Sequence, residues 1–468
     1  MFLVQRGELE GRLDCYGNYA KKFNSINSIY PSQKLSSLVK TFSGGTPDKS
    51  KPNYWNGDIH WVSPKDFGEL EIFTSEDMIT EAGLKNSATK LIPKGNILMV
   101  VRSGILQHTL PVSINTKDVT INQDIKALII QDNKVTPYYL AHFLRTFQDK
   151  ILSCVVKHST TVQSVNTKEF ENLQIPIPPL DIQQQIVHQM QAAYAEKRQK
   201  EAQTAQLLAS IDGYLLEKLG ITLPQAVEKK KTFVVWSDRV SGGRFDPKLY
   251  LPSSKNLLDC LCTSKYESTL LKNIVNQSVS GDWGVEDVQE GYSKCLVIRA
   301  TEFDNRYNLK LENSRVKYRY ILNEKLDKLD VQANDLLIEK SGGSTDQPVG
   351  RIALITKDIL NENVIGFSNF VHKIRLSSAV HPEFVYYFLK TIHNIKVTDL
   401  MQSQTNGIRN LIMREYLNIP IPIPPINIQT EIVTHISTLR AQAQQLETEA
   451  KTALTIAKAA VEKQILGL

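Results

Sequence analysis

Two long stretches of the chain repeat apolar residues every three, four or seven positions, which is the spacing of a single stripe along an α-helix. One stretch follows Pro179 and the other follows Pro425, and neither contains a proline. Gly220 and Gly467 stand where helices commonly end. The pattern therefore predicts two helices of about 40 residues, each roughly 60 Å long at a rise of 1.5 Å per residue.

An apolar stripe of this length needs a partner surface, and the other predicted helix is the nearest candidate. The first helix leads from the first half of the chain into the second, so connectivity favours an antiparallel, coiled-coil-like pair. Packing of the helices on some other body, or on another chain, is the alternative. Asp181 and Asn427 occupy positions where an N-cap residue is favoured.

The chain also repeats itself in segments that keep the same order. The clearest match pairs residues 175–183 with 421–429, where Ile-Pro-Ile-Pro-Pro is followed four positions later by Gln. The offset drifts only from 232 (11 to 243) to 246 (175 to 421). Because solenoid repeats are far shorter, a whole domain with its helix is duplicated. The other matches are 11–14 with 243–246, 62–67 with 298–303, 96–104 with 334–342, and 137–144 with 382–389.

Outside the two helices, short apolar runs indicate buried strands and longer periodic segments indicate helices. We therefore predict a mixed α/β (α+β) chain with two globular domains, at 1–179 and 223–425. A pair of long antiparallel helices at 180–222 and 426–468 would separate them with pseudo-two-fold symmetry. The runs are 97–101, 127–130, 296–298 and 336–338 for strands, and 138–147 and 383–392 for helices.

Composition sets limits on this picture. A chain of 468 residues is too long for one ordinary core. The five cysteines are an odd number, and one residue between Cys260 and Cys262 is a poor zinc spacing, so we expect reduced thiols and a cytoplasmic location. No membrane span and no signal peptide is visible. The net charge of +6 suits a polyanionic partner without requiring one.

Catalytic signatures are missing from the sequence. It has no phosphate-binding loop, no Gly-x-Gly-x-x-Gly, no Asn-Pro-Pro-aromatic tetrapeptide, no His-Glu-x-x-His and no Gly-x-Ser-x-Gly. The nine histidines are scattered, so no metal site is expected. Glu339-Lys340 after an apolar run could belong to a nuclease site, although a solvated turn is the commoner reading. We therefore expect no catalytic residue and no cofactor in this chain.

Polar turns at the ends of the predicted strands are the candidates for binding nucleic acid. Ser, Thr and backbone N–H groups bind phosphates, and Arg, Lys, Gln and Asn can read base edges. The alternative is that such turns only connect strands. The candidate DNA-binding residues are Thr46, Lys65, Arg102, Ser103, Gln107, His108, Gln163, Arg299, Lys340, Ser341, Thr345, Gln347, Asn406 and Arg409.

These features together resemble the specificity subunit of type I restriction-modification systems. The resemblance covers essentially the whole chain, and its most specific part is Ile-Pro-x-Pro-Pro-x-x-x-Gln at the entry of both helices. Ser-Gly-Gly-Thr-Pro at 43–47, Tyr-Trp-x-Gly at 54–57 and the segment 406–411 add to it. The second half lacks the Ser-Gly-Gly-Thr-Pro element and has 278–284 instead, which weakens any transfer of contact residues to it.

The resemblance implies that each globular domain is a target-recognition domain that reads one half of a split, asymmetric site in double-stranded DNA. The helices would hold the half-sites about one helical turn apart, near 34–36 Å. They would also dock two modification subunits, which bind S-adenosylmethionine and methylate adenine, and a restriction subunit using ATP and Mg could join. A stand-alone nuclease or methyltransferase with a degenerate site, and a scaffold binding only protein, are the alternatives. The predicted partner-binding stripe residues are Ile182, Ile186, Leu208, Leu215, Ile428, Ile432, Leu446 and Val461.

Overall fold

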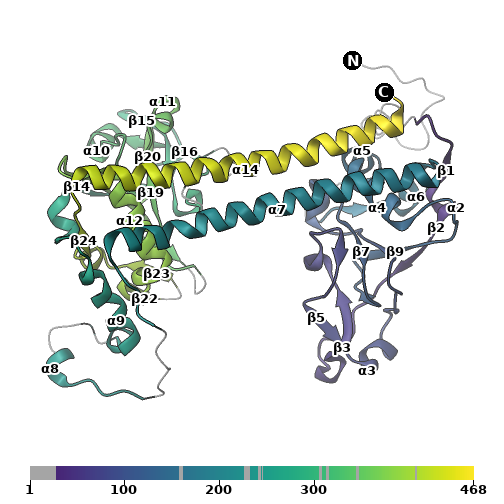
Figure 1. Cartoon of the computed structure of the whole chain (residues 1–468), viewed down its shortest axis with the longest axis horizontal. Helices are drawn as coiled ribbons and strands as arrows, with labels where there is room; N and C mark the ends of the chain where they lie inside the picture. The colour runs from purple at the N-terminus through teal and green to yellow at the C-terminus, as the bar shows by residue number, and fades with distance from the viewer. Residues whose placement is uncertain are drawn as a thin grey trace. The chain divides into compact units, whose positions relative to one another are not determined.

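The computed structural model describes residues 28–157, 162–225, 232–240, 244, 246–304, 308–311, 316–343, 347–405 and 408–468. Helices and strands are mixed in it, as predicted (Figure 1). The chain divides into two compact units: residues 1–201 with 447–468 form unit 1, and residues 202–446 form unit 2. The predicted match of 11–14 with 243–246 lies largely outside the described residues.

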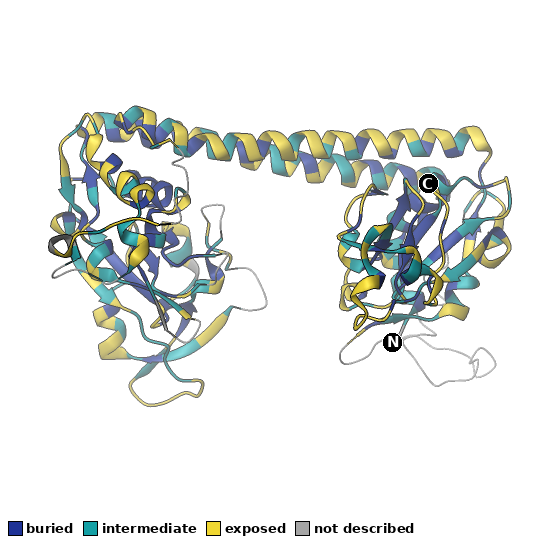
Figure 2. Ribbon diagram, turned by 90° about the horizontal axis from the view of Figure 1, so that it is seen from below, coloured by how far each residue is buried: buried dark blue, intermediate teal, exposed yellow. Residues whose placement is uncertain are grey.

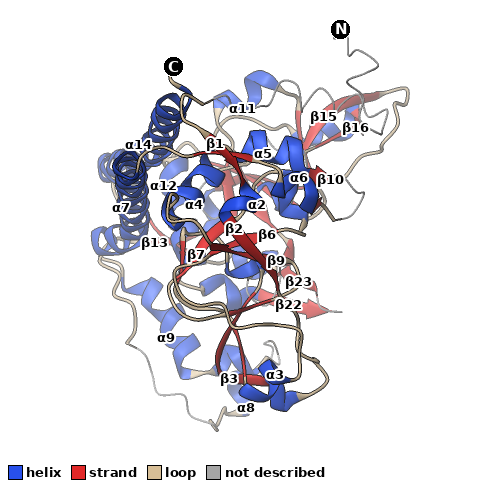
Figure 3. Ribbon diagram, turned by 90° about the vertical axis from the view of Figure 1, so that its right-hand side faces the viewer, coloured by secondary structure: helices blue, strands red, loops and turns tan. Residues whose placement is uncertain are grey.

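A five-stranded sheet forms the centre of unit 1 (Figure 3). Its order is β2 (Val39–Ser43), β9 (Ile125–Ile130), β6 (Ile97–Val100), β7 (Val112–Asn115) and β4 (Glu71–Ile72). The central strand β6 is buried at every residue. Ile97 and Met99 face one core cluster, and Leu98 and Val100 face another. The apolar run predicted as a strand is therefore a strand covered on both faces.

Smaller elements complete unit 1. A second sheet has the order β5 (Asp77–Ile79), β3 (Trp55–Val62) and β8 (Thr120–Ile121). Two further pairs are β1 (Ser32–Lys34) with β12 (Gln174–Pro176), and β10 (Val156–Lys157) with β11 (Ser164–Val165). The helices are α2 (Leu35–Leu38), α3 (Glu81–Lys85), α4 (Pro137–Thr146), α5 (Gln148–Val155) and α6 (Thr167–Glu171), and the 3-10 turns are η2 (Pro52–Tyr54), η3 (Pro64–Asp66) and η4 (Gly104–Gln107).

Unit 2 repeats this plan. Its four-stranded sheet, β14 (Val275–Ser280), β21 (Val371–Leu376), β17 (Leu336–Glu339) and β19 (Ile352–Leu354), matches β2-β9-β6-β7. Its three-stranded sheet, β16 (Lys317–Leu322), β15 (Tyr292–Ile298) and β20 (Ile365–Phe367), matches β5-β3-β8, with one parallel pair in each. The pair β13 (Ser268–Leu270) and β24 (Pro420–Pro422) matches β1 and β12. The duplication in the sequence is thus a duplication of fold.

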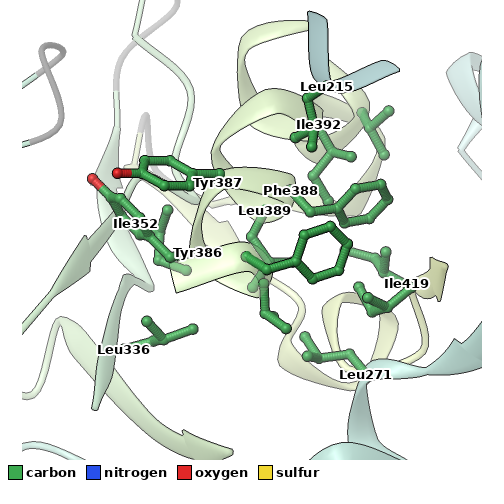
Figure 4. Close-up of a cluster of buried hydrophobic side chains, with 14 of the residues drawn as sticks. Leu215, Leu271, Leu336, Ile352, Tyr386, Tyr387, Phe388, Leu389, Ile392 and Ile419 are labelled. Carbon is green, nitrogen blue, oxygen red and sulfur yellow. The ribbon is translucent and has the colours of Figure 1, made fainter. Parts of the chain in front are cut away.

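The core of unit 2 gathers around its longest globular helix, α12 (Pro382–Asn394). Figure 4 shows Phe388 and Leu389 of α12 among Leu271, Ile419 and Leu215, all of which are buried. The remaining elements are β18 (Ser341–Gly343), β23 (Ile408–Leu411), β22 (Gln402–Thr405), α8 (Ser237–Val240), α9 (Pro252–Cys260), α10 (Asn323–Leu329), α11 (Lys357–Glu362), α13 (Met413–Tyr416), η5 (Pro247–Tyr250), η6 (Leu261–Thr263), η7 (Leu271–Ile274), η8 (Ala300–Glu302) and η9 (Val397–Met401).

The two predicted long helices are present as α7 (Leu180–Leu219) and α14 (Ile426–Leu466). In unit 1 the start of α7, with Ile186, shares a core cluster with the end of α14, with Val461. In unit 2 the end of α7, with Leu215, shares a cluster with the start of α14, with Ile432. Start lies beside end in both units, so the helices pair in antiparallel directions as predicted. Figure 2 shows exposed residues along both helices, on the faces that do not pack into these clusters.

The entry of each long helix differs from the prediction. The helices begin at Leu180 and Ile426, so Asp181 and Asn427 lie inside the first turn, and the N-cap expectation was wrong. The ends agree with the prediction, because Gly220 and Gly467 follow the helices with φ of +72° and +73°.

A buried glutamine fixes each helix entry instead. Gln183 Nε2 donates to Lys134 O at 2.6 Å and to Pro178 O at 2.9 Å, and its Oε1 accepts from Thr136 N at 3.0 Å. Gln429 repeats two of these bonds, with Pro424 O and with the backbone N–H before α12. This glutamine clamp explains why the Ile-Pro-x-Pro-Pro-x-x-x-Gln motif ends in glutamine. It joins the proline-rich entry to the residue that precedes α4 or α12.

Candidate nucleic-acid interface

Polar turns of unit 1 meet beside its two sheets. The Gly-rich turn after β2 lies against the turn after β8, where Gly45 N donates to Ile121 O at 2.9 Å and Thr46 Oγ1 donates to Gln123 Oε1. A Cβ on Gly44 would stand 2.1 Å from Ile121 O. Only glycine permits this close approach of the two turns.

The turn after β6 joins the same group. Arg102 Nε lies 4.0 Å from Asp124 Oδ1, and the backbone of Arg102 pairs with Ser164 of β11. Ser103 N donates to Gln163 O at 3.1 Å. The Arg102 side chain is 62% exposed, so its guanidinium can reach a ligand. These turns form the first turn cluster, which comprises residues 43–47, 102–103, 121–124 and 163–165.

The other residues predicted in the first half are placed differently. Gln107 ends η4 and His108 follows it, and both residues are exposed. The Gln163 side chain is buried. Lys65 Nζ lies 3.0 Å from carboxylates at both 76 and 77, and hydrogen bonds to Asp77 and then to Glu76 raise its pKa. Lys65 is therefore held by two acids of its own unit.

The matching turns of the two units are offset by one residue from the sequence match. That match pairs Leu98 with Leu336, but these side chains face opposite sides of their sheets. Leu98 and Leu337 both face the cluster that lacks the long helices. A shift of one residue reverses the face of a strand. Arg102 therefore corresponds to Ser341, and not to the lysine that precedes it.

The second half also retains the close approach at its first turn. A Cβ on Gly281 would stand 2.2 Å from Ser368 O, as one on Gly44 would stand 2.1 Å from the carbonyl oxygen of Ile121 at the end of β8. The Ser-Gly-Gly-Thr-Pro motif is missing there, yet the glycine that the packing needs is present. The second turn cluster comprises residues 278–282, 340–341, 367–372 and 409–411.

A histidine and two serines of this second turn cluster were not predicted. His372 Nε2 lies 2.7 Å from Ser278 Oγ, and Nδ1 lies 3.1 Å from Ser280 Oγ. Lys340 Nζ donates to Ser280 Oγ at 3.4 Å. Burial, and then the charge of Lys340, lower the pKa of His372 to about 4, so the ring is neutral at pH 7. The signal in the sequence was the alternation of serine along β14, which puts both hydroxyls on one face.

Only some of the remaining residues predicted in the second half lie in the second turn cluster. Ser341 Oγ donates to Asn410 Oδ1 at 2.6 Å, which ties β18 to β23 beside Arg409. Gln347 is half-buried. Thr345 and Asn406 lie outside the described residues.

Two cationic positions of unit 2 belong to structural ion pairs. Arg299 Nη2 donates to Glu302 Oε1 at 2.6 Å, and the Glu302 side chain is fully buried. Glu339 is 1% exposed and accepts two bonds from Arg351, at 2.8 and 2.9 Å. Removing one partner of such a pair would leave a buried charge. The carboxylate of the Glu339-Lys340 pair is thus saturated by arginine, which disfavours the nuclease reading.

The stripe residues predicted to bind a partner lie largely inside the chain. Ile186, Leu215, Ile432 and Val461 are fully buried in their own units. Their side chains are therefore not available on the surface, and a docked subunit would use other faces of the helices. Ile182, Leu208 and Ile428 are partly buried against the same cores, and Leu446 is half-exposed.

Membrane-spanning helices and metal-binding side-chain groups are both absent from the part of the chain that the structure describes. No helix there combines the length and the apolar character that crossing a bilayer requires. No group of three or more His, Cys, Asp and Glu side chains there is arranged to hold a metal ion.

Comparison with known proteins gives consistent matches. The family model described as the type I restriction modification DNA specificity domain matches residues 30–209 and 265–455. The specificity subunit of the Escherichia coli type I restriction enzyme EcoR124I/EcoR124II is 40% identical over 182 residues, which are 38% of this chain and 45% of that protein. The MjaIX specificity subunit of Methanocaldococcus jannaschii is 30% identical over 160 residues, 33% of this chain and 35% of that protein.

These matches span less than half the length of either relative. A chain from a solved structure on complex assembly and conformational transition of the type I R-M system is 15% identical and covers 93% of this chain and 97% of its own, with a TM-score of 0.51. This last likeness is one of fold.

Proposed function

We propose that this chain, which belongs to the type I restriction-modification DNA specificity domain family, is the subunit that reads a split, asymmetric DNA site for a type I restriction-modification complex. The observation that carries the proposal is the pair of turn clusters. They stand at equivalent places of two duplicated units, but they present different side chains. Two units that share one fold but carry different contact residues are suited to binding two different half-sites.

The cations of the clusters are proposed to read bases. Arg102 in the first turn cluster can donate two parallel bonds to the O6 and N7 atoms of a guanine. In the second turn cluster its equivalent is Ser341, and the cation is moved to Lys340. Backbone N–H groups and hydroxyls around them, such as that of Thr46, would bind phosphates and set the register.

The partners follow from the proposed role. One or more modification subunits, two by the duplication, would bind S-adenosylmethionine and methylate adenine on DNA in the cytoplasm. A restriction subunit using ATP and Mg could join them. The chain itself would need no cofactor. Support comes from the names of the relatives, which are specificity subunits of restriction enzymes.

The test is to map methylated adenines in a genome whose only type I specificity subunit is this chain. The expected result is one split motif with two unlike halves and a fixed gap. Exchanging residues 28–175 for those of a relative should change one half and leave the other half and the gap. Methylation with no split motif, or a motif that changes in both halves, would contradict the proposal.

The same preparation separates the alternatives. A scaffold that binds only protein would give no gel shift with DNA carrying the mapped site. A stand-alone enzyme would methylate or cut that DNA without any other subunit.

A further inference from the structure

The two units carry the same corner, where α4 or α12 meets the long helices. The shared backbone positions fix the correspondence. Gln183 and Gln429 clamp equivalent residues, so α7 and α14 correspond with an offset of 246, as residues 183 and 429 show. Position 212 on α7 therefore corresponds to position 458 on α14.

Unit 2 closes its corner with its own acid. Asp212 Oδ1 accepts from Thr391 Oγ1 at 2.7 Å, and Oδ2 accepts from Asn394 Nδ2 at 2.9 Å. Arg440 donates to Tyr387 Oη at 3.0 Å and to Asn308 Oδ1 at 2.8 Å. Both carboxylate oxygens and the arginine are thus satisfied within the unit.

Unit 1 has a lysine, Lys458, in place of that acid. Thr146 occupies the position of Thr391, and its hydroxyl is buried with no hydrogen-bond partner among the described residues. The preceding residue, Arg145, lines a cavity of about 260 Å³ together with Lys197 and Lys458, and no carboxylate lines it. This cavity, the basic recess, has Lys458 at the position where unit 2 has Asp212.

The cations of the basic recess are held in place but not neutralised inside it. Arg145 donates to Val112 O at 3.2 Å and lies 5.0 Å from the ring centre of Tyr194. Lys197 pairs with Glu201 at 3.2 Å on the outside of α7, and Glu201 does not line the recess. Among the described residues, none forms an ion pair with Lys458 within 4 Å.

The charge state of Lys458 agrees with an uncompensated site. Burial lowers its pKa first, and Arg145 lowers it further. Asp149 acts in the opposite direction, and Lys197 lowers the pKa again. Asp149 does not line the recess. An anion inside the recess would offset the repulsion among the three cations.

We propose that the basic recess binds an aspartate or glutamate side chain of the modification subunit. This rests on the proposed function, which supplies that partner. Charge complementarity demands an anion, because three cations line the cavity without an acid. Phe67, Leu110 and Leu454 also line it, so the ligand must bring apolar surface as well as charge.

A protein side chain fits this lining better than a DNA phosphate does. A phosphate of duplex DNA is fixed on a wide polar backbone and would lose hydration against the apolar wall. A carboxylate on a flexible stem can enter a cavity while its apolar neighbours cover the rim. Since Asp212 fills the matching corner of unit 2, the two units offer a modification subunit different anchors.

The test measures binding of purified modification subunit to the full chain without DNA. Lys458→Asp should weaken binding at least ten-fold, because aspartate there can accept from Thr146 as Asp212 does from Thr391, and so closes the recess. Only the bond to Thr391 has a counterpart in unit 1, because Asp149 stands where unit 2 has Asn394, so urea unfolding of the variant must match that of the unaltered chain before binding is compared. Lys451→Asp makes the same charge change at an exposed position of α14 outside the recess and should bind like the unaltered chain.

Carbodiimide cross-linking identifies the ligand directly, since it joins a lysine amine to a carboxylate in contact with it. In the complex it should link Lys458 or Lys197 to one Asp or Glu of the modification subunit. Lys458→Met, which removes the charge at nearly the same size, should lose the link at 458 and weaken binding. Equal binding by Lys458→Asp and Lys451→Asp, or links from other lysines only, would overturn the proposal.

One further outcome would also overturn it. If Lys458→Asp left subunit binding unchanged but weakened DNA binding and its salt dependence, the recess would hold a phosphate. The proposed function can be tested apart from this one. A Lys458→Asp complex assembled at high subunit concentration should still methylate the same split motif, whereas failure of the DNA-reading role would abolish the motif for the unaltered chain.

Discussion

At the scale of single residues, exposure and pairing decide which predicted contacts remain available. Arg102 is exposed and only loosely paired, whereas Lys65 is held by two acids at 3.0 Å. Sequence reasoning treated them alike, because a pattern of turns does not reveal which carboxylates lie nearby. The same limit applies to Gln163, whose side chain is buried while its carbonyl is used.

We expect Arg102→Ala to relax discrimination at one base pair of one half-site. Loss of a bidentate contact costs about 1–3 kcal/mol, or roughly 5- to 150-fold in preference for the correct base. The measurement is binding of the assembled complex to a panel of single-base variants of its site. Lys65→Ala is the matched control and should leave the panel in the same order. Uniform weakening by Arg102→Ala across the panel would assign it to a phosphate.

A buried histidine makes unit 1 sensitive to acid. His142 is fully buried, its two ring nitrogens have no hydrogen-bond partner among the described residues, and burial, then Arg145, lower its pKa from 6.5 to about 4. Its stability contribution is complete above pH 6.5 and is lost as the pH falls toward 4, because the unfolded chain then binds the proton first.

We expect His142→Phe to remove part of this loss. From pH 7.5 to pH 5 the histidine accounts for on the order of 2 kcal/mol of unfolding free energy. Urea unfolding at both pH values should therefore show a smaller difference for His142→Phe than for the unaltered chain. The same substitution at exposed His108 should leave the difference as it was, and an equal effect at both positions would rule out burial as the cause.

At the scale of elements, periodicity predicted the helices and strands that bury apolar residues. It did not predict the exact helix starts, which depend on local hydrogen bonds. The long helices and the apolar strands followed from spacing alone. The helix starts did not, since a glutamine inside the first turn bonds to the proline-rich entry. The sequence match between the equivalent strands β6 and β17 was also wrong by one residue. The correct correspondence is revealed only by the side of its sheet that each leucine faces.

The glutamine clamp predicts a matched pair of unstable variants. Gln183→Leu removes three hydrogen bonds to backbone groups at the entry of α7. Buried groups left without partners cost about 1–3 kcal/mol each when water cannot replace the bond. We expect Gln183→Leu and Gln429→Leu each to lower the free energy of unfolding by at least about 1–3 kcal/mol, the cost of one such group, in urea titrations. Gln184→Leu, on the exposed side of α7, is the control; a loss as large there would contradict the clamp.

At the scale of the whole molecule, the duplication was the most informative feature of the sequence. It predicted two like units joined through two long helices, because five ordered matches cannot be satisfied by one core. It could not predict the differences between the units. The basic recess is lined by Lys458, which stands where the other unit has Asp212, and this correspondence is visible only once α4, α7 and α14 are known to meet.

The gap between half-sites is expected to depend on the length of the helix pair. If the helix pair sets that gap, inserting four residues between 201 and 202 and four between 446 and 447 should lengthen both helices together. At 1.5 Å per residue this adds roughly 6 Å, and DNA rises about 3.4 Å per base pair, so the gap should grow by about one or two base pairs with both half-sites unchanged. Methylome mapping of the variant measures both.

The control is the insertion in α7 alone. It shifts α7 relative to α14, so contacts on the two sides of the insertion cannot both be kept. These contacts are the Lys200–Glu449 ion pair at 2.5 Å and the Thr204–Ala443 hydrogen bond at 3.4 Å. This variant should unfold at lower temperature and should methylate poorly at any gap. If the paired insertion folds and methylates at the original gap, the separation of the half-sites is set elsewhere than in the helices.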